Sequence, residues 1–549
     1  MHSRRSFIGA LGAAAASLRG TTLKPELILF NGNIHTMDPS NPRAQAVAIL
    51  EGKFFAVGSN EEIANLSSAS VTRIDLGGRT VTPGFVDAHL HTASSGLRHL
   101  KEVNCDLRSI AAIQSALRER AARTPKGEWV IGFLYDDTKT AEGRPLSKAD
   151  LDAAVPDHPV LVNHRGGHTN YVNSRALEIA DVNEKTPDPQ GGKFERGPDG
   201  KLTGRIEERA SERFDSKIPQ VATRADRREG VKLISQMIVK TGITSVTDPQ
   251  GSTDDLMAYQ DARDAGDLSV RVYHFLSAEY VPRMIAAGVK TGLGDEWVRV
   301  GAMKMVADGS ISERTAWVSE PYVGRPLDHG IQVRTEEELY NDAKPAYAAG
   351  WQIATHGNGD LAIDVVLRVY ARLQKENPRP DPRFRIEHCT VINPDLVRRI
   401  KAQGVIPAPF SSYVYYHGEK MKEYGAERLN SMFALRSFLD AGIPATMSSD
   451  YPPGPFEPMM FLQSSVTRTD INGNVWGPKQ RITVEEALRV ATMNGAHGSY
   501  EEKIKGSIET GKLADLTVLS RDPLKENPST LVSIPIERTM VGGRWMYES

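Results

Sequence analysis

The chain has 549 residues, of which 40% are hydrophobic and 25% are charged. This composition is ordinary for a soluble globular protein, and the length leaves room for more than one domain. The formal net charge of −2 argues against a nucleic-acid-binding function and against electrostatic attachment to an anionic membrane.

A basic segment followed by an apolar one opens the chain. Arg4 and Arg5 precede an Ala-rich run from Phe7 to Leu18, which is too short to span a bilayer. Residues 1–21 therefore resemble a twin-arginine signal, which predicts export of the protein to the periplasm. The alternatives are a disordered basic tail and a cytoplasmic protein. No later run of about 18 apolar residues occurs, so no membrane span is expected.

Short strands are predicted near both ends of the chain. They cover residues 26–30, 33–37, 46–49, 54–58 and 72–76, and then 514–519 and 536–543. Asn31-Gly32 predicts a tight turn between the first two strands. Because chain ends often lie close together, residues 22–80 and 505–549 are expected to form one small composite β-sandwich domain.

Residues 81–504 alternate between strand and helix patterns. Helical patterns such as 336–349 and 362–376 separate most of the strands, and Thr483 opens a late helix with a capping box. The strand candidates are residues 84–91, 243–248, 269–275, 298–306, 352–356, 383–388, 404–409 and 444–450. Eight such strands predict an α/β fold, a (β/α)8 TIM-type barrel.

One segment is too long to be a connection within a barrel. Residues 100–235 follow the first barrel strand and contain strands of their own at 129–134 and 159–163. Pro198-Asp199-Gly200 marks the turn of a hairpin. This segment is therefore expected to form an inserted subdomain that caps the mouth of the barrel.

The first barrel strand carries two histidines, in the run Pro83-Gly84-Phe85-Val86-Asp87-Ala88-His89-Leu90-His91. Side chains at i and i+2 of a strand share a face, so His89 and His91 point the same way. Two imidazoles placed in this way can bind one metal ion, and zinc is the commonest match in a hydrolase. Two surface histidines on an ordinary strand would give the same pattern.

Three further metal-binding residue types fall at the ends of later strands. They are His356, His388 and Asp450. Each alone has a simpler explanation, either a core histidine or a helix N-cap. Together with His89 and His91 they favour a metal site, because barrel active sites form at the C-terminal ends of the strands.

Lys304 lies among apolar residues of the fourth predicted strand. Burial disfavours the charged form of lysine and lowers its pKa, and the neutral amine can add carbon dioxide. The carbamate formed is an anionic oxygen ligand that can bridge two metal ions. The alternative is a lysine paired with Asp308 or Glu313.

As an ordered set, these motifs resemble the amidohydrolase superfamily, within the branch of N-substituted formamide deformylases and related TIM-barrel metal hydrolases. The resemblance runs from about residue 25 to the end. It rests on residues 82–91, 242–246, Lys304 with Asp308-Gly309-Ser310, His356, 386–388, Ser449-Asp450 and the closing segment 506–515.

The resemblance implies a role for each position. His89 and His91 would bind the more buried of two zinc or other divalent ions, and His356 and His388 the more exposed one. Lys304, carboxylated, would bridge them. Asp450 would bind the first ion, accept a proton from the hydrolytic water and pass it to the leaving nitrogen. One ion in place of two is an alternative.

Residues around the rim are candidates for substrate binding. His168, in the inserted segment, is expected to reach over the mouth. Asp308, Trp317 and Tyr322 are further candidates, as is the run Tyr413, Tyr415 and Tyr416. For the aromatic residues the alternative is a place in the core, and for Asp308 a turn.

The sequence therefore predicts a metal-dependent hydrolase that cleaves the C–N bond of a small amide or formamide. Deamination or cyclic-amide opening at the same site is the nearest alternative. A metal-binding relative without catalytic activity is the alternative of another class. Many members of the superfamily self-associate, so a homo-oligomer is expected. Cys105 and Cys389 are interpreted as buried thiols, with a single disulfide as the alternative.

Overall fold

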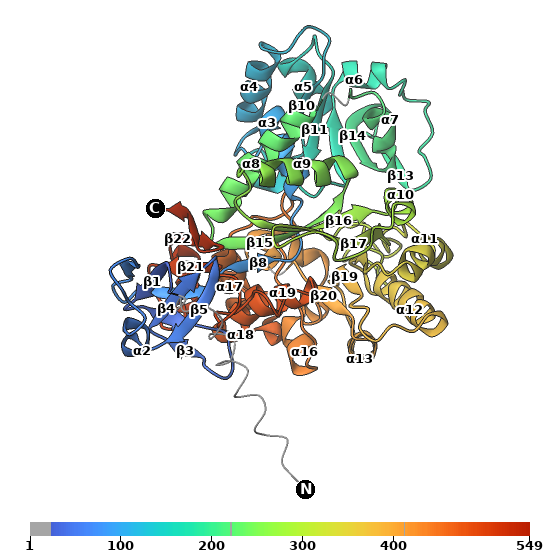
Figure 1. Ribbon diagram of the computed structural model, residues 1–549. Helices are drawn as coiled ribbons and strands as arrows, with labels where there is room; N and C mark the ends of the chain where they lie inside the picture. The colour runs from blue at the N-terminus through green and yellow to red at the C-terminus, as the bar shows by residue number, and fades with distance from the viewer. Residues whose placement is uncertain (1–23, 220–221, 411) are drawn as a thin grey trace.

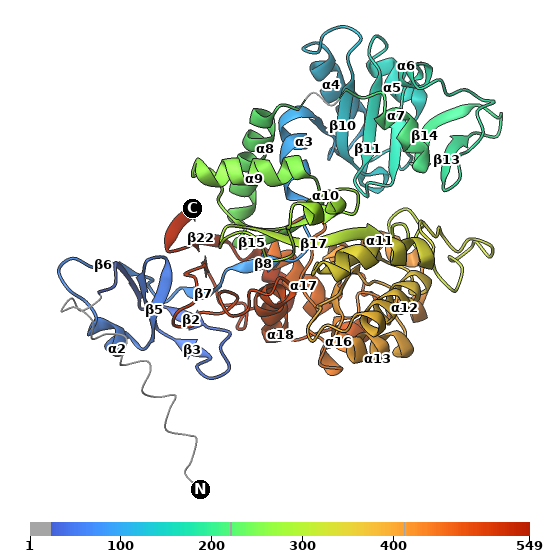
Figure 2. The ribbon, with the colours of Figure 1, turned by 45° about the vertical axis from the view of Figure 1, so that its right-hand side comes forward.

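The computed structural model of the protein describes residues 24–219, 222–410 and 412–549. Figures 1 and 2 show a central α/β body, a subdomain that projects from it and a small β region at which the described chain begins and ends. The export signal predicted at residues 1–21 lies outside the described residues.

A curled sheet of seven parallel strands forms the centre of the molecule, in the order β20-β19-β18-β17-β16-β15-β8. Its strands are almost entirely buried, as expected for parallel strands covered by helices. They are β8 (Phe85–Asp87), β15 (Ile243–Gly251), β16 (Arg271–Ser277), β17 (Val298–Val306), β18 (Ile353–Gly357), β19 (Arg385–His388) and β20 (Ile406–Ala408). This is the arrangement of a TIM-like barrel.

The eighth predicted strand, residues 444–450, does not form a regular strand. The segment still bonds to both edges of the sheet, because Thr446 donates to Pro407 and Met447 accepts from Ala88. Two features interrupt the ladder. Pro444 has no N–H to donate, and the Met447 N–H is directed to Val490 instead of to a strand. The prediction of a regular strand at residues 444–450 was therefore wrong, although the segment lies between β8 and β20, the two outermost strands of the sheet.

Helices follow most of the barrel strands. Capping boxes start several of them, including α11 at Thr335 and α18 at Thr483, as predicted for the latter. These helices are α3 (Thr92–Lys101), α8 (Arg224–Val239), α9 (Thr253–Asp264), α10 (Val281–Ala286), α11 (Glu336–Ala348), α12 (Asp360–Glu376), α13 (Pro394–Gln403), α16 (Leu435–Asp440), α17 (Pro458–Thr467), α18 (Val484–Arg489) and α19 (Gly495–Gly498). Among the described residues, no helix combines the length and the apolarity needed to cross a membrane.

The projecting subdomain is built on a six-stranded sheet in the order β13-β14-β12-β11-β10-β9. Val160 and Val162 of β11 face one hydrophobic cluster and Leu161 faces another, so both faces of this sheet are covered. The predicted hairpin at residues 198–200 joins β13 to β14. The strands are β9 (Val103–Asn104), β10 (Val130–Tyr135), β11 (Val160–His164), β12 (Thr169–Val172), β13 (Gly192–Arg196) and β14 (Leu202–Glu208), and the helices are α4 (Ile110–Ala121), α5 (Lys148–Ala154), α6 (Ser174–Ile179) and α7 (Glu212–Asp215). Helix α8, further along, packs with the barrel core.

Two further sheets lie near the chain ends. One, in the order β5-β4-β1-β6, is built from N-terminal strands alone, and the other, in the order β23-β22-β21-β7-β2-β3, joins strands from both ends of the chain. They share one hydrophobic cluster, in which Leu29 and Val47 of the first sheet meet Val81, Leu516 and Met540 of the second. The strands β1 (Leu27–Phe30) and β2 (Asn33–His35) flank the predicted turn but enter different sheets. The others are β3 (Arg43–Ala44), β4 (Ala46–Leu50), β5 (Lys53–Gly58), β6 (Thr72–Asp75), β7 (Thr80–Pro83), β21 (Leu516–Leu519), β22 (Ile536–Val541) and β23 (Arg544–Glu548), with helix α2 (Asn60–Ala64).

A buried ion pair joins the barrel to the chain-end sheets. Arg271, at the start of β16, donates two hydrogen bonds to the carboxylate of Asp515, at 2.7 and 3.0 Å. Both side chains are almost inaccessible to solvent, and Asp515 also accepts from the N–H of Gly542. Removal of one partner would leave a buried charge without compensation.

We therefore expect Asp515→Ala to lower the free energy of unfolding by about 3–5 kcal/mol, measured by urea denaturation. Arg224→Gln is the matched control, because it removes the ion pair with Asp261 at the exposed surface. Equal urea midpoints for the two variants would show that the buried pair does not hold the two parts together.

Candidate metal centre

The structure brings the predicted metal ligands to the C-terminal end of the barrel sheet. His89 and His91 follow β8, His356 and His388 lie at the ends of β18 and β19, and Asp450 ends the irregular eighth segment. The ring centroids of His89 and His388 are 4.9 Å apart, and those of His356 and His388 are 4.5 Å apart. Because the strands are parallel, their C-terminal ends all lie at the same end of the barrel. This explains how residues distant in sequence meet there.

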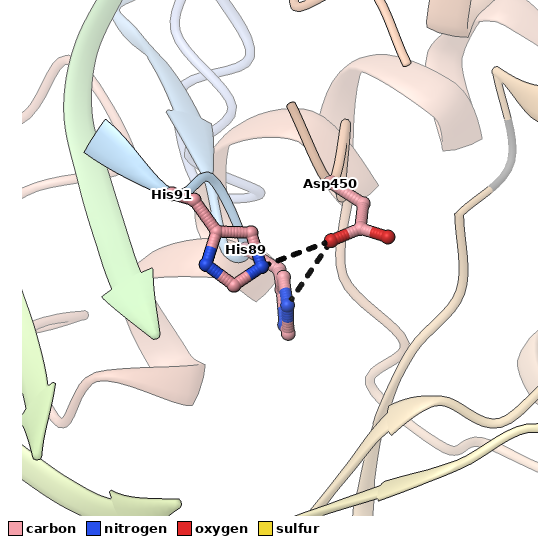
Figure 3. A group of neighbouring side chains, drawn as sticks. All are labelled: His89, His91 and Asp450. Carbon is pink, nitrogen blue, oxygen red and sulfur yellow. Dashed lines mark ion pairs between the residues drawn. The ribbon is translucent and has the colours of Figure 1, made fainter. Parts of the chain in front are cut away.

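His89, His91 and Asp450 form the tightest group (Figure 3). The Nε2 atoms of His89 and His91 lie 3.3 and 3.4 Å from the same carboxylate oxygen, Oδ1 of Asp450. Their ligand atoms all lie within 4.8 Å of one another, as the ligands of a single ion require. On the other side of the Asp450 carboxylate, Nδ1 of His388 lies 3.8 Å from Oδ2.

A buried chain of charges fixes the orientation and the protonation of His89. Arg385 donates two hydrogen bonds to the carboxylate of Glu387, and this carboxylate makes a short hydrogen bond with Nδ1 of His89. Burial alone would raise the pKa of Glu387, but Arg385 and His89 hold it well below its usual range. An ionised carboxylate can only accept, so Nδ1 of His89 carries the proton and Nε2 presents a lone pair.

This arrangement fits a cation. Nε2 of His89 is buried without a hydrogen-bond partner among the described residues, and it faces an oxygen of Asp450 that also presents lone pairs. Two lone pairs facing each other in a site with little water repel, and a positive ion between them removes the repulsion. The set of nitrogen and carboxylate donors suits zinc and similar divalent ions.

His356 and His388 are neutral and available as ligands. Burial lowers the pKa of His388 to about 3, and burial together with His388 and Lys304 lowers the pKa of His356 well below its usual value. Nε2 of His356 lies 3.0 Å from the carbonyl oxygen of Gly309. The same nitrogen lies 3.1 Å from Nδ2 of Asn358, so Nε2 is engaged with neighbouring polar groups while Nδ1 has no hydrogen-bond partner among those described.

Lys304 is buried in β17, paired in register next to β18. Burial lowers the pKa of its amine to about 8, while the charges of Glu387 and Asp450 oppose this shift. The alternative of an ion pair with Asp308 or Glu313 is not realised, because the described residues give Lys304 no ion pair. A buried amine without a fixed partner is the state that favours carboxylation.

Two buried aspartates hold the backbone around the site. Asp87 accepts hydrogen bonds from the N–H groups of His89 and Ser449 and so ties β8 to the segment that carries Asp450. Asp248 accepts from the N–H of Thr92, directly after His91. His388 and Asp450 have φ values of 69° and 51°, a left-handed conformation that costs free energy outside glycine and is often found at functional sites.

The remaining predicted residues lie in different surroundings. Asp308 accepts from the N–H groups of Trp317, Asn358 and Gly359 and thereby supports the start of α12. Trp317 is half-buried, and the fully buried Tyr322 donates its hydroxyl to the carbonyl of Ala316. Neither aromatic residue lines the cavity at the site. Cys105 and Cys389 are buried, free thiols.

A small cavity of about 30 Å³ adjoins the candidate ligands. Its lining combines polar and apolar side chains. Its residues are Gly166, His168, Ser310, Ile311, Ser312, His356, Asn358, His388, Thr390, Phe410, Tyr413, Phe433, Asp450 and Pro453. Of the predicted rim residues, His168 and Tyr413 therefore reach the site.

Sequence reasoning missed the roles of Arg385 and Glu387. Both stand on β19, two residues apart, and are completely buried. Two opposite charges at i and i+2 within an otherwise apolar strand were a visible signal, because charged residues are rarely buried unless they are paired.

A profile of the amidohydrolase family matches residues 72–547 of the chain. A Bacillus subtilis protein named "Putative amidohydrolase YtcJ" is 30% identical over 95% of this chain and 99% of its own length. The N-substituted formamide deformylase of Arthrobacter pascens is 29% identical over 95% of this chain and 98% of its own length. The crystal structure of an uncharacterized metal-dependent hydrolase from Pyrococcus horikoshii OT3 superposes with a TM-score of 0.74 at 26% identity, covering 91% of this chain and 99% of that one.

The buried charges beside His89 lead to a prediction. Glu387→Gln should weaken zinc binding about 10- to 100-fold, because a neutral amide no longer fixes the tautomer of His89 or raises its basicity. Competition with a chromophoric chelator measures this affinity. Glu376→Gln, at the exposed end of α12, is the control and should bind zinc as the wild type does. Unchanged affinity in both variants would contradict the assigned role of Glu387.

Proposed function

The chain belongs to the amidohydrolase family, and from this membership and the side chains gathered at the barrel mouth we propose that it hydrolyses the C–N bond of a small amide or formamide. One relative is named an N-substituted formamide deformylase, and a structural neighbour is described as a metal-dependent hydrolase. The observation that carries the proposal is the contact between Nε2 of His89 and Oδ1 of Asp450, two lone-pair donors that face each other in a buried site.

Six residues would hold the metal: His89, His91, Lys304, His356, His388 and Asp450. Zinc is the proposed ion, and two ions bridged by a carboxylated Lys304 are the proposed arrangement. When bound, such ions supply a Lewis acid that polarises a carbonyl group and makes water more acidic at neutral pH.

Asp450 is the proposed general base and acid. Its carboxylate lies within 4 Å of ring nitrogens of His89, His91 and His388. Beside the cation that these residues would hold, the carboxylate is ionised and can accept a proton from water. After the water oxygen has bonded to the carbonyl carbon, the proton passes from Asp450 to the nitrogen, and the C–N bond breaks. An amine and an acid are the products.

The cavity supports a small, partly apolar substrate. Ile311, Phe410 and Phe433 line this cavity together with His356 and Asp450. An apolar substituent on the amide would pack against these three apolar side chains, with the carbonyl near the candidate ligands.

Two alternatives use the same site. Deamination or the opening of a cyclic amide would need the same ligands and the same Asp450, and would differ only in what the cavity accepts. A catalytically inactive metal-binding protein is the alternative of another class. The complete set of ligands together with an ionised Asp450 argues against it.

The test of the proposal is a substrate panel. The zinc-loaded protein should hydrolyse N-formyl amines faster than N-acyl amino acids or cyclic amides, measured as initial rates of C–N bond cleavage. Asp450→Asn should lower kcat by about 100- to 10,000-fold while it retains most of the zinc, because the proton relay is lost.

Turnover by Asp450→Asn at the wild-type rate would contradict the proton relay. Zinc binding without turnover of any member of the panel by the wild type would support the inactive alternative. Hydrolysis of cyclic amides alone would move the assignment to that reaction.

The proposed carbamate on Lys304 can be observed directly. Protein loaded with zinc in [13C]bicarbonate should give a carbamate resonance in its carbon NMR spectrum, and Lys304→Gln should abolish the resonance. Lys505→Gln is the matched control, because Lys505 is also buried but forms a 2.7 Å ion pair with Glu501 that keeps its amine protonated. A resonance that persists in Lys304→Gln would contradict the assignment.

A further inference from the structure

The inserted subdomain contributes a side chain to the wall of the metal-site cavity. His168 lies in the turn between β11 and β12, far from the barrel ligands in sequence, and it lines the same cavity as His356, His388 and Asp450. The ring centroids of His168 and His356 are 6.2 Å apart. The cavity is thus lined from both the barrel and the insertion.

The turn that carries His168 is anchored to the barrel. His164, at the end of β11, contacts Glu313 of the loop after β17, with 2.9 Å between Nδ1 and Oε1. A Cβ atom added at Gly166 would lie 1.8 Å from the same carboxylate oxygen, so a larger residue there would displace the carboxylate of Glu313. The position of His168 relative to the metal ligands is therefore set by direct packing.

Glu208 fixes the imidazole of His168. Its Oε2 atom lies 3.0 Å from Nδ1 of His168, and its N–H donates to the carbonyl of the same residue at 2.9 Å. The carboxylate therefore accepts the proton of Nδ1. The described residues provide no hydrogen-bond partner for the other ring nitrogen, Nε2, in this cavity wall.

The backbone conformation and the burial of Glu208 both cost free energy. Its backbone has φ 49° and ψ −131°, a combination that is unfavourable for any residue with a Cβ atom. Its second carboxylate oxygen, Oε1, is buried without a hydrogen-bond partner among the described residues. Strain and an unpaired buried oxygen at one residue next to a cavity indicate a functional requirement.

The charge of His168 agrees with a donor role. Burial would lower the pKa of its imidazole, but the hydrogen bond and the charge of Glu208 raise it to about 9. Both ring nitrogens then carry protons at neutral pH, so Nε2–H can donate to an oxygen in the cavity.

We propose that His168 is a catalytic residue supplied by the insertion, which donates a hydrogen bond from Nε2 to the carbonyl oxygen of the substrate, and that Glu208 is its positioning residue. This inference rests on the proposed hydrolysis. As the water oxygen bonds to the carbonyl carbon, the π electron pair of the C=O bond moves to the oxygen. The His168 proton stays on nitrogen and stabilises the negative charge that develops there.

Activity against N-formylbenzylamine tests the inference first. His168→Phe, which keeps a ring but removes the donor, should lower kcat by about 100-fold or more and change KM little, because the hydrogen bond strengthens in the transition state. His168→Gln should restore part of the loss. Glu208→Gln keeps the size of the side chain and should lower kcat by about tenfold or more, because the imidazole of His168 loses its charged hydrogen-bond acceptor. A purely structural role predicts a lower melting temperature instead.

Glu207→Gln is the matched control. Glu207 neighbours Glu208 on β14 and forms its ion pair with Arg205, away from His168. This variant should keep the kcat of the wild type.

Binding of methylphosphonate, a tetrahedral anion, to the zinc-loaded protein gives a readout that needs no turnover. Titration calorimetry should show about tenfold or greater weakening in His168→Phe, weaker binding in Glu208→Gln and unchanged binding in Glu207→Gln. If the wild type hydrolyses no N-formyl amine but binding still depends on His168 and Glu208, the proposed reaction fails and the inference stands. Equal phosphonate affinity in all variants, or no binding to the wild type, overturns the inference.

Discussion

The candidate centre depends on one interaction, the short hydrogen bond between Glu387 and His89 inside the barrel. Arg385 keeps the carboxylate ionised, the carboxylate holds the proton on Nδ1 of His89, and the lone pair of Nε2 is thereby directed at Asp450. Each of these groups is costly to bury alone, and together they satisfy most of one another's hydrogen-bonding atoms. Among the described residues, Nε2 of His89, which faces the site, and Nη1 of Arg385 have no hydrogen-bond partner. The free lone pair that would bind a cation therefore follows from the hydrogen bonds that link Arg385, Glu387 and His89.

Buried hydrogen bonds and strained backbone also shape other parts of the barrel mouth. Asp87 accepts hydrogen bonds from the N–H groups of His89 and Ser449, and Asp248 accepts one from Thr92, the residue after His91. These main-chain contacts hold the loops of the site. His388 and Asp450 adopt left-handed backbone conformations, and Glu208 a more unusual one. The sheet below is regular and apolar, and it supplies the stability that tolerates this local strain.

The insertion is more than a cover for the mouth. His164 and Gly166 fit it against Glu313, and this contact carries His168 to the cavity. A site formed from two parts of the chain can change its substrate preference through the insertion while the barrel retains the metal ligands.

The sequence by itself predicted a parallel barrel, seven strands of which the structure contains, and the histidines and Asp450 that lie near one another at the C-terminal ends of these strands. It could do so because strand periodicity and apolar burial are local properties, and because the parallel topology places all C-terminal strand ends at one edge. It did not reveal that residues 444–450 would lack a regular ladder, since that follows from Val490 accepting the N–H of Met447. It also could not show that Glu387 orients His89, that Glu208 holds His168, or that Tyr322 turns away to Ala316. These contacts join residues far apart in the chain, and only tertiary packing decides which donor meets which acceptor.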